Sequence, residues 1–366
     1  MPLPSIDPAE YAPQLATKVS QFQRDFACFD LPEPAVYSSA PLNYRLRAEF
    51  RMWHNGERVD YAMFDPAEPK QAVVVEHFAP ACESICTAMP RLREALQASA
   101  ALKSNLFQVN FLATLSGELM ITFIYHRRLD ESWEAAAREL ARDLATEMQV
   151  QLIGRSHKQK IVVGRDWVLE EFELNGRHLS YQQIEGAFSQ PNGGVNRQML
   201  GWACRQAAGL GGDLLELYCG NGNFTIALAP LFDRVLATEV SKSSIQSAHH
   251  NLATNGIDNV ALVRMSSEEI SGALAGLREF NRMKEIDLAN YRFSTLFVDP
   301  PRSGLDAATL ELAGSFDHIL YISCNPMTLQ ENVAALQGTH QITASAVFDQ
   351  FPYTPHLECG LLLTKR

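Results

Sequence analysis

The chain has 366 residues, of which 46% are hydrophobic and 20% are charged, and this length fits two domains of ordinary size better than one. Such a composition excludes a disordered chain or a fibrous repeat, and no run of about 18 apolar residues predicts a membrane span. The formal net charge of -11 excludes nucleic-acid binding through bulk electrostatic attraction, so any such surface must be a local basic patch.

The N-terminus lacks the basic start and apolar run of a secretion signal. Seven cysteines are scattered without C-x-x-C pairs, which argues against a disulfide framework, a zinc site and an iron-sulfur cluster. We therefore expect a cytoplasmic protein that has no metal and no obligate protein partner.

The N-terminal half predicts an α+β unit whose strands come in hairpin pairs. Asn55-Gly56 is one turn signal and the segment 116–118 is another. The strand-like runs beside these turns are 49–53, 58–64, 106–115 and 119–126. A long charged helix is expected over 130–150, with Ala and Leu on one side.

Basic side chains gather in this half. The run 44–52 alternates with period two, which predicts a strand with an apolar and a basic face. The apolar face carries Leu46, Ala48, Phe50 and Met52, and the other carries Arg45, Arg47, Glu49 and Arg51. Further basic residues are Arg127, Arg128, Arg155, His157, Lys158 and Lys160. A charged strand face is usually only solvated surface, but together these residues offer contacts to phosphate.

Pro- and Gly-bearing residues 188–196 form a candidate junction, and the C-terminal half alternates short apolar runs with helical stretches. We expect six or seven strands there. The runs are 214–218, 234–239, 260–264, 295–299, 318–323, 342–348 and 359–364. Such alternation is typical of an open, mostly parallel sheet with helices on both faces.

A glycine loop follows the first of these strands. Gly220 and Gly222 allow a close approach of the backbone to a ligand, and Glu239 ends the next strand, where an acidic residue can bind ribose hydroxyls. A dinucleotide site would call for a third glycine at the position of Thr225. The loop therefore predicts a nucleotide-type ligand other than a dinucleotide, although a G-x-G pattern alone also occurs in purely structural turns.

Two further polar segments follow strands at the expected ligand edge of the sheet. Asp299-Pro300-Pro301-Arg302 resembles the fourth motif of class I methyltransferases, in which an aromatic residue commonly follows the prolines when an exocyclic amine is methylated. Arg302 argues against amine chemistry and supplies a cation near a developing oxyanion. Cys324 ends the next strand and is a candidate nucleophile, although most cysteines are inert small hydrophobes. His356 and Glu358, which point the same way in an extended segment, are both candidate bases.

The chain resembles the RNA 5-methyluridine methyltransferase family in the order and spacing of five segments. These are 190–192, 215–224, 299–302, 323–326 and 356–358. The resemblance implies a Rossmann-like class I methyltransferase domain over 188–366, preceded by an RNA-binding domain over 1–187, of which residues 1–40 are candidates to pack on the catalytic domain. It also implies S-adenosylmethionine as the cofactor.

By this resemblance Cys324 is the nucleophile, Glu358 the base and Arg302 a support for the uracil. The implied cofactor-binding residues are Gln190, Tyr218, Gly220, Asn223, Glu239 and Asp299. The candidate RNA-binding residues are Arg45, Arg47, Arg51, Phe107, Lys158 and Lys160, and Phe107 or Trp53 is a candidate to fill the gap that a flipped base leaves.

No iron-sulfur motif or small N-terminal β-barrel is visible in the sequence, which favours the tRNA branch of the family, with the T-arm as partner and uridine 54 as target. Ribosomal or transfer-messenger RNA is the alternative substrate. Two rival functions stay open: an amine or cytosine methyltransferase, and an RNA-binding or RNA-folding protein that uses the fold as a scaffold.

Overall fold

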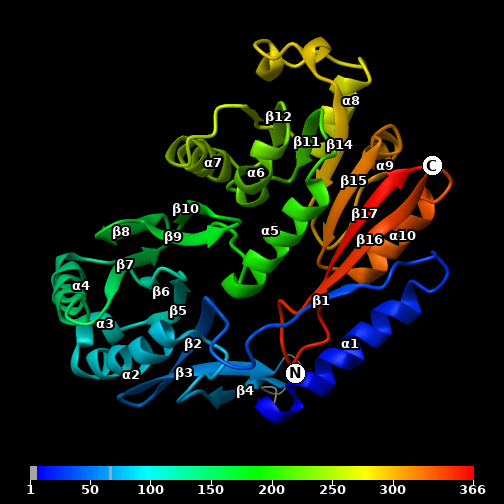
Figure 1. The fold of residues 1–366 in the computed structure, drawn as a ribbon. Coiled ribbons are helices and arrows are strands. Elements are labelled where there is room, and N and C mark those ends of the chain that lie inside the picture. Colours follow the sequence, from blue (N-terminus) through cyan, green and yellow to red (C-terminus); the bar gives the residue numbers. More distant parts are fainter. Residues whose placement is uncertain (1–5, 66–67) are drawn as a thin grey trace. The chain divides into compact units, whose positions relative to one another are not determined.

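The computed structural model describes residues 6–65 and 68–366, which divide into two compact units (Figure 1). Unit 1 comprises residues 6–10, Ala40–Phe172 and Gln182–Gly194, and unit 2 comprises Tyr11–Ser39, Glu173–Tyr181 and Val195–Arg366. The expected boundary lay at residue 188, with residues 1–40 as candidates to pack on the catalytic domain. In this division an N-terminal helix and strand within Tyr11–Ser39 belong to unit 2, so that the chain passes between the units several times.

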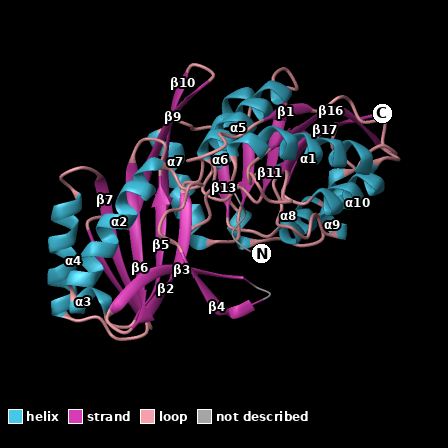
Figure 2. Ribbon diagram, turned by 90° about the horizontal axis from the view of Figure 1, so that it is seen from below, coloured by secondary structure: helices cyan, strands magenta, loops and turns pink. Residues whose placement is uncertain are grey.

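Unit 1 is built on a seven-stranded sheet with the order β4-β3-β2-β5-β6-β7-β8. The strands are β2 (Arg47–Asn55), β3 (Arg58–Asp65), β4 (Glu68–Val74), β5 (Leu106–Ala113), β6 (Glu118–Tyr125), β7 (Gln149–Ser156) and β8 (Gln159–Val163). The helices α2 (Glu83–Ala98), α3 (Ala100–Lys103) and α4 (Glu131–Leu144) cover one face of it (Figure 2). Their apolar side chains and the inward residues of the strands form one core.

Both predicted hairpins are present in unit 1, as β2-β3 and β5-β6. The alternation along 44–52 is also confirmed, because Leu46, Ala48, Phe50 and Met52 are all buried. The predicted helix 130–150 is wrong at its C-terminal end. Asp130 caps its first turn by accepting from the Trp133 backbone N–H, but α4 ends at Leu144 and β7 begins at Gln149. The β-branched and apolar residues of 149–156 pair with β6, and this pairing overrides the helical pattern.

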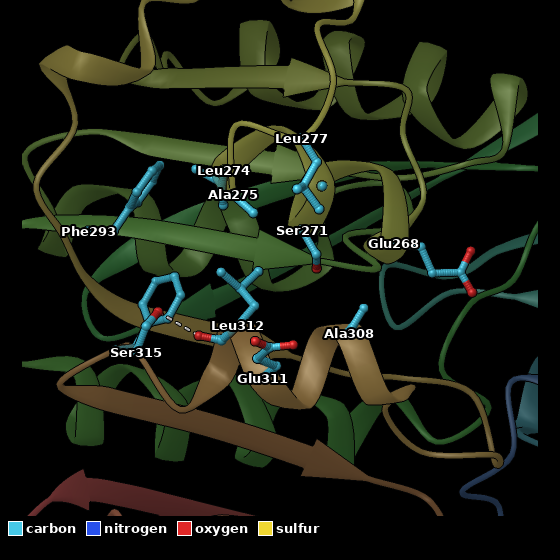
Figure 3. A pocket seen from close by; sticks show the side chains of 12 residues that line it. Glu268, Ser271, Leu274, Ala275, Leu277, Phe293, Ala308, Glu311, Leu312 and Ser315 are labelled. Atoms are coloured by element: carbon cyan, nitrogen blue, oxygen red, sulfur yellow. Dashed lines mark hydrogen bonds between the residues drawn. The ribbon is translucent and has the colours of Figure 1, made fainter.

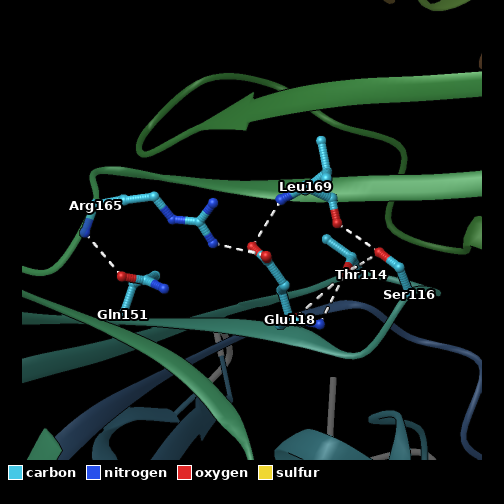
Figure 4. Close-up of polar contacts among 6 residues, drawn as sticks. All are labelled: Thr114, Ser116, Glu118, Gln151, Arg165 and Leu169. Carbon is cyan, nitrogen blue, oxygen red and sulfur yellow. Dashed lines mark hydrogen bonds and ion pairs between the residues drawn. The ribbon is translucent and has the colours of Figure 1, made fainter.

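A buried carboxylate ties the β5-β6 turn to the segment before β9 (Trp167–Leu174) (Figure 4). Glu118 accepts hydrogen bonds from the Arg165 guanidinium at 2.6 Å and from the Leu169 backbone N–H at 2.9 Å. Ser116 Oγ donates to the Leu169 carbonyl, and Gln151 Oε1 accepts from the Arg165 backbone N–H. Glu118 and Ser116 at the β5-β6 turn thus both bond to Leu169 of β9, and these bonds fix the turn against β9.

Glu118→Ala is expected to lower the free energy of unfolding by about 1–3 kcal/mol, since it leaves the partly exposed Arg165 guanidinium and the Leu169 backbone N–H without their acceptor. Denaturant unfolding measures the change. The control is Glu139→Ala on the exposed side of α4, which we expect to shift the value by less than about 0.5 kcal/mol. Equal stability of both variants would show that the Glu118 contacts contribute nothing.

Unit 2 contains an eight-stranded sheet with the order β1-β16-β17-β15-β14-β11-β12-β13. The strands are β1 (Ala35–Tyr37), β11 (Asp213–Leu217), β12 (Val235–Thr238), β13 (Val260–Val263), β14 (Phe293–Val298), β15 (His318–Ser323), β16 (His340–Phe348) and β17 (Glu358–Lys365). All seven predicted C-terminal strands are present, and only β17 runs antiparallel to its neighbours. The N-terminal strand β1 extends the sheet beside β16 (Figure 1).

Helices cover both faces of this sheet. One face packs against α1 (Tyr11–Asp25), α8 (Ser267–Leu274), α9 (Ala307–Ala313) and α10 (Pro326–Leu336). The other helices of the unit are α5 (Gly193–Ala207), α6 (Asn223–Leu228) and α7 (Lys242–Thr254), and β9 pairs with β10 (Arg177–Ile184) in a separate ribbon. Within the described part of the chain, no helix is long and apolar enough to cross a bilayer.

Candidate active site

The carboxyl ends of the parallel strands bring most of the predicted residues of unit 2 to one edge. Leu217 on β11 lies opposite both Thr238 on β12 and Val298 on β14. Tyr218, Glu239 and Asp299 are the residues that follow these three. Ligands of open α/β sheets bind at this edge, so the structure confirms that these three candidates share one place in the fold.

The glycine loop turns sharply between β11 and α6. Gly220 and Gly222 have φ values of +57° and +87°, and a Cβ at Gly220 would meet no atom within 4 Å, so there is open space beside the loop. Glu239 accepts from the Gly220 backbone N–H at 3.1 Å and from the Ser241 N–H at 2.7 Å. Its carboxylate is therefore held at the loop by two backbone donors.

Two asparagines that the sequence analysis missed brace this loop. Asn196 on α5 and Asn223 exchange two side-chain hydrogen bonds of 3.0 and 2.9 Å, and the fully buried Asn251 on α7 donates to the Asn221 carbonyl at 3.0 Å. Neither has a motif of its own, since each lies inside a helix remote in sequence from the loop. Gln190, the remaining cofactor candidate, lies in the unit 1 segment Gln182–Gly194 and stays a prediction.

The loop after β14 is attached to the start of α10. The Arg302 carbonyl accepts from Asn325 Nδ2 at 2.9 Å and from Thr328 Oγ1 at 3.2 Å. The buried Asn332 accepts from the Leu305 backbone N–H at 2.9 Å, which fixes the far end of the loop. The backbone at Arg302 is therefore set by the segment that also carries Cys324.

Strand register places the candidate nucleophile opposite the candidate base. Ser323, the last residue of β15, pairs with Cys359 on β17, and this antiparallel register makes Cys324 and Glu358 the next pair along. Burial raises the pKa of the Cys324 thiol to about 11. The carboxyl groups of Glu358 and Asp299 add to the increase, and the Arg302 guanidinium opposes it. All four predicted groups thus act on one another electrostatically.

Burial also raises the pKa values of the carboxyl groups at this edge. It raises the pKa of Glu358, which is 4% exposed, to about 8, with a further increase from Asp299 and an opposing effect of Arg302. It raises the pKa of Asp299 to about 7 and that of Glu216, inside β11, to about 8. Carboxyl groups with such raised values exchange protons near neutral pH, as general bases do.

The two candidate bases have different surroundings. Glu358 is buried beside Cys324, whereas His356 is exposed, and burial together with Arg302 and Lys18 lowers the pKa of its imidazole. A cavity of about 480 Å³ reaches both Cys324 and His356. The geometry therefore favours Glu358 as the base next to the nucleophile, with His356 in the wall of the adjoining cavity.

The RNA-binding candidates of unit 1 fall into two groups. Arg45 donates to the Arg47 carbonyl, and Arg47 to the Ala187 carbonyl, so both of these guanidinium groups have partners within the protein. Arg51 is exposed, and its guanidinium lies 3.7 Å from the ring centroid of Phe107, which also stacks on His126 with a centroid distance of 4.0 Å.

The basic residues around the β7-β8 turn are largely compensated. Lys160 pairs with Asp166 at 2.8 Å and Glu185 at 3.4 Å, and Arg155 also pairs with Glu185. Lys158 is exposed in the turn itself with a φ of +55°. The strongest candidate for contact with a nucleic acid is consequently the exposed stack of Arg51, Phe107 and His126, named here the β2-β5 stack.

A second cavity of unit 2, of about 610 Å³, lies among α8, α9 and the start of β14 (Figure 3). Leu274, Leu312 and Phe293 are among its lining residues, and Ser315 Oγ donates to the Leu312 carbonyl at 2.6 Å. None of the candidate site residues lines it, so it has no part in the chemistry considered below. In residues 6–65 and 68–366, no three His, Cys, Asp or Glu side chains are grouped so as to hold a metal ion.

Comparisons with known proteins give the family of the chain. The family model described as tRNA (uracil-5-)-methyltransferase matches residues 10–366. A protein of Aromatoleum aromaticum named tRNA/tmRNA (uracil-C(5))-methyltransferase is 75% identical over 366 residues, which cover all of this chain and 98% of that relative. A protein of the same name from Dechloromonas aromatica is 68% identical over 366 residues, and the match covers all of both chains.

Among solved structures, the chain is similar to the Pyrococcus abyssi tRNA (uracil-54, C5)-methyltransferase in complex with S-adenosyl-L-homocysteine. The TM-score is 0.72 at 19% identity, and the match covers 97% of this chain and 83% of that one. This likeness confirms the predicted α/β methyltransferase fold.

Proposed function

This chain belongs to the tRNA (uracil-5-)-methyltransferase family, and from that premise we propose that it methylates carbon 5 of a uridine in tRNA, with S-adenosylmethionine as the methyl donor. The observation that carries the proposal is the pairing of Cys324 with Glu358 beside Asp299 and Arg302. Uridine 54 of the T-loop is the proposed target, as the name of the Pyrococcus abyssi protein states for that enzyme. Transfer-messenger RNA, which the names of the bacterial relatives include, is a second proposed substrate, and the cytoplasm is the proposed compartment.

The residues at the sheet edge fit S-adenosylmethionine. The open space beside Gly220 accepts a ligand close to the backbone, and Glu239 at the end of β12 is placed for ribose hydroxyls. Asn223, Tyr218 and Asp299 complete the proposed binding set, with Gln190 as a further candidate. When bound, the cofactor supplies an electrophilic methyl group at this edge of the sheet.

Carbon 5 of a free uracil is too weak a nucleophile to accept a methyl group, so the protein residues must activate it. We propose that the Cys324 thiolate adds to carbon 6, which breaks the C5–C6 double bond and moves electron density to carbon 5 and the O4 enolate. Arg302 faces this developing negative charge. After carbon 5 is methylated, Glu358 removes its proton, the double bond re-forms and the thiolate leaves.

The experiment that tests this function uses unmodified tRNA and S-adenosylmethionine with a labelled methyl group. After digestion to nucleosides, mass spectrometry is expected to find the label on carbon 5 of uridine. Label on an exocyclic amine or on cytosine would replace the proposal with one of the rival methylations. Absence of label from tRNA and transfer-messenger RNA would overturn it in favour of ribosomal RNA or of a non-catalytic role.

The methylation rate is expected to rise with pH. A carboxyl group with a pKa raised to about 8 is mostly protonated below that value, and only its deprotonated form can accept the carbon 5 proton. At saturating RNA and cofactor, log kcat should therefore increase by up to about one per pH unit between about pH 6 and 8. Above pH 8 it should level off if proton removal by Glu358 limits the rate, and it should keep increasing if thiolate addition limits it, because burial raises the pKa of the Cys324 thiol to about 11. The measurement is kcat over this range, and a rate that falls as pH increases would contradict the assignment of a buried carboxylate base.

Unit 1 is the proposed RNA-binding unit, and its exposed β2-β5 stack is the proposed contact. Arg51→Ala is expected to weaken tRNA binding and to reduce the slope of log K against log salt by about one, since one phosphate contact is lost. Filter binding at several salt concentrations measures it. Arg138→Ala on α4, where the arginine pairs with Glu134, is the matched control and should keep the wild-type slope. An unchanged slope for Arg51→Ala would remove this arginine from the interface.

A further inference from the structure

The loop that precedes the candidate base contains a fully buried carboxylate with no part in the reaction. Asp349 lies at the end of β16 and begins the segment 349–357, which leads directly into Glu358 at the start of β17. Its side chain is 0% exposed. A buried charge is strongly destabilising unless it is paired and hydrogen-bonded. The partners of Asp349 therefore stabilise the conformation of the loop at its first residue.

Its side-chain partners come from the N-terminal helix α1, more than 300 positions away in the sequence. Lys18 Nζ lies 2.6 Å from Asp349 Oδ1, and Gln14 Nε2 donates to Oδ2 at 2.8 Å. Lys18 also donates to the Phe351 carbonyl at 2.9 Å, inside the same loop. One ammonium group of α1 thus joins the first residue of the loop to its interior.

Other residues of the loop contact β1, α1 and one another. The Asp349 backbone N–H donates to Tyr37 on β1, and the Tyr353 ring packs edge-on against Tyr11 of α1 at 6.0 Å. Thr354 Oγ1 donates to the Phe351 carbonyl at 2.8 Å, the same carbonyl that Lys18 contacts. Gln350 in the same segment donates to the Met199 sulfur of α5 at 3.5 Å. The segment is therefore supported by α1 and β1 together with α5, and α1 supplies the charged partner of its first residue.

The same helix borders the reactive groups. Lys18, Thr17 and Gln21 line the cavity of about 480 Å³ that reaches Cys324 and His356. Because the loop leads directly into β17, a displacement of its first residues would change the approach to Glu358. The segment Tyr11–Ser39 contributes in this way to the wall of the cavity as well as to the edge of the sheet.

We propose that Lys18 and Asp349 are positioning residues that hold the segment 349–357 so that Glu358 faces the carbon 5 proton. This rests on the proposed function, because it assigns the pair to one step of that reaction. The step is the last one, in which the C5–H bond breaks, the proton passes to Glu358, the C5–C6 double bond re-forms and the C6–S bond to Cys324 breaks. The pair leaves addition of the thiolate and methylation of carbon 5 unchanged.

The test compares Lys18→Met with Lys18→Arg, on tRNA that contains either uridine or 5-fluorouridine at the target. Fluorine on carbon 5 cannot be removed as a proton, so the fluorinated RNA stays attached to Cys324 after methylation and reports only the earlier steps. With normal tRNA, Lys18→Met is expected to lower kcat by about ten- to a hundredfold at an unchanged KM. A larger share of the enzyme should then be found as an RNA adduct that survives denaturation.

With fluorinated RNA, Lys18→Met should form the adduct at the wild-type rate. Lys18→Arg should regain much of the lost kcat, because it keeps a cation beside Asp349. Lys284→Met, an exposed change outside the site, is the control for loss of a lysine. If Lys18→Met does not fold, Asp349→Asn and the double variant Lys18→Met/Asp349→Asn, which has no unpaired charge, give the same comparison.

Two results would overturn the positioning role. One is an equal slowing of the reactions with normal and fluorinated RNA, which would mean general damage to the site, and the other is a lower melting temperature with unchanged kcat. A wild-type protein that forms no 5-methyluridine would instead refute the proposed function, so the two failures are distinguishable.

Discussion

Cys324→Ala is expected to abolish uridine methylation, with a decrease in kcat of at least about 10⁴-fold. The other thiols at this edge, Cys219 and Cys359, are buried, and burial raises the pKa of each well above its ordinary value. The carboxyl groups of Glu358 and Asp299 are poor nucleophiles toward carbon 6. The variant should also form no denaturation-resistant adduct with tRNA. Transfer of labelled methyl groups and denaturing gel electrophoresis measure the two effects.

The control for this change is Cys28→Ala, which removes an exposed cysteine outside the site and should leave both readings at the wild-type level. The removal of Cys324 should not reduce cofactor binding, because none of the proposed cofactor contacts involves the thiol. Methylation that persists in Cys324→Ala would refute the covalent mechanism and favour direct attack, as an amine substrate allows. A Cys324→Ala protein that keeps a biological role would point to the scaffold function.

Glu358→Gln is expected to separate methyl transfer from product release. The amide cannot accept the carbon 5 proton, so kcat should fall by about 10²- to 10⁴-fold while a methylated RNA adduct accumulates on Cys324. His356→Gln should have a much smaller effect, because the exposed imidazole lies in the cavity wall and not opposite the nucleophile. Glu331→Gln on the exposed side of α10 is the control for the loss of a carboxylate.

The Glu358 result would be contradicted if His356→Gln accumulated the adduct and Glu358→Gln did not. That outcome would make the histidine the base. If neither variant accumulated adduct while both turned over normally, proton removal would have to be assigned to another group at the edge, such as Asp299, whose carboxyl group acts electrostatically on Glu358.

Glu358→Gln should also make the protein more stable at pH 8. In the folded chain burial raises the pKa of Glu358 to about 8, so between the unfolded value near 4.5 and about pH 8 the folded state holds a proton that the unfolded state releases. Stability from this group is therefore lost as pH increases through that interval. Removal of the charge is expected to raise the free energy of unfolding by up to about 4 kcal/mol at pH 8, as measured by denaturant unfolding.

The hydrophobic pattern and the motif spacing were sufficient to predict the seven C-terminal strands of the unit 2 sheet, whereas the eighth strand, β1, was not predicted. The predicted strands are short apolar runs that end in polar residues, and parallel strands place such ends at one edge of the sheet. The grouping of Glu239, Asp299 and Cys324 at that edge therefore follows from local pattern alone. The same holds for the hairpins of unit 1, whose turn residues and alternation are local signals. The end of α4 was mispredicted, because pairing of Gln149–Ser156 with β6 is a non-local interaction.

By itself, then, the sequence determined at which end of which strand the candidate site residues lie, because strand ends and motif order are properties of short segments. Their proposed roles stay predictions. Tertiary structure decided the rest. Only the antiparallel register of β17 places Glu358 rather than His356 opposite Cys324, and only the packing of α1 brings Lys18 to Asp349. Contacts between residues hundreds of positions apart depend on how the chain folds back on itself, and a single sequence contains no local signal for them.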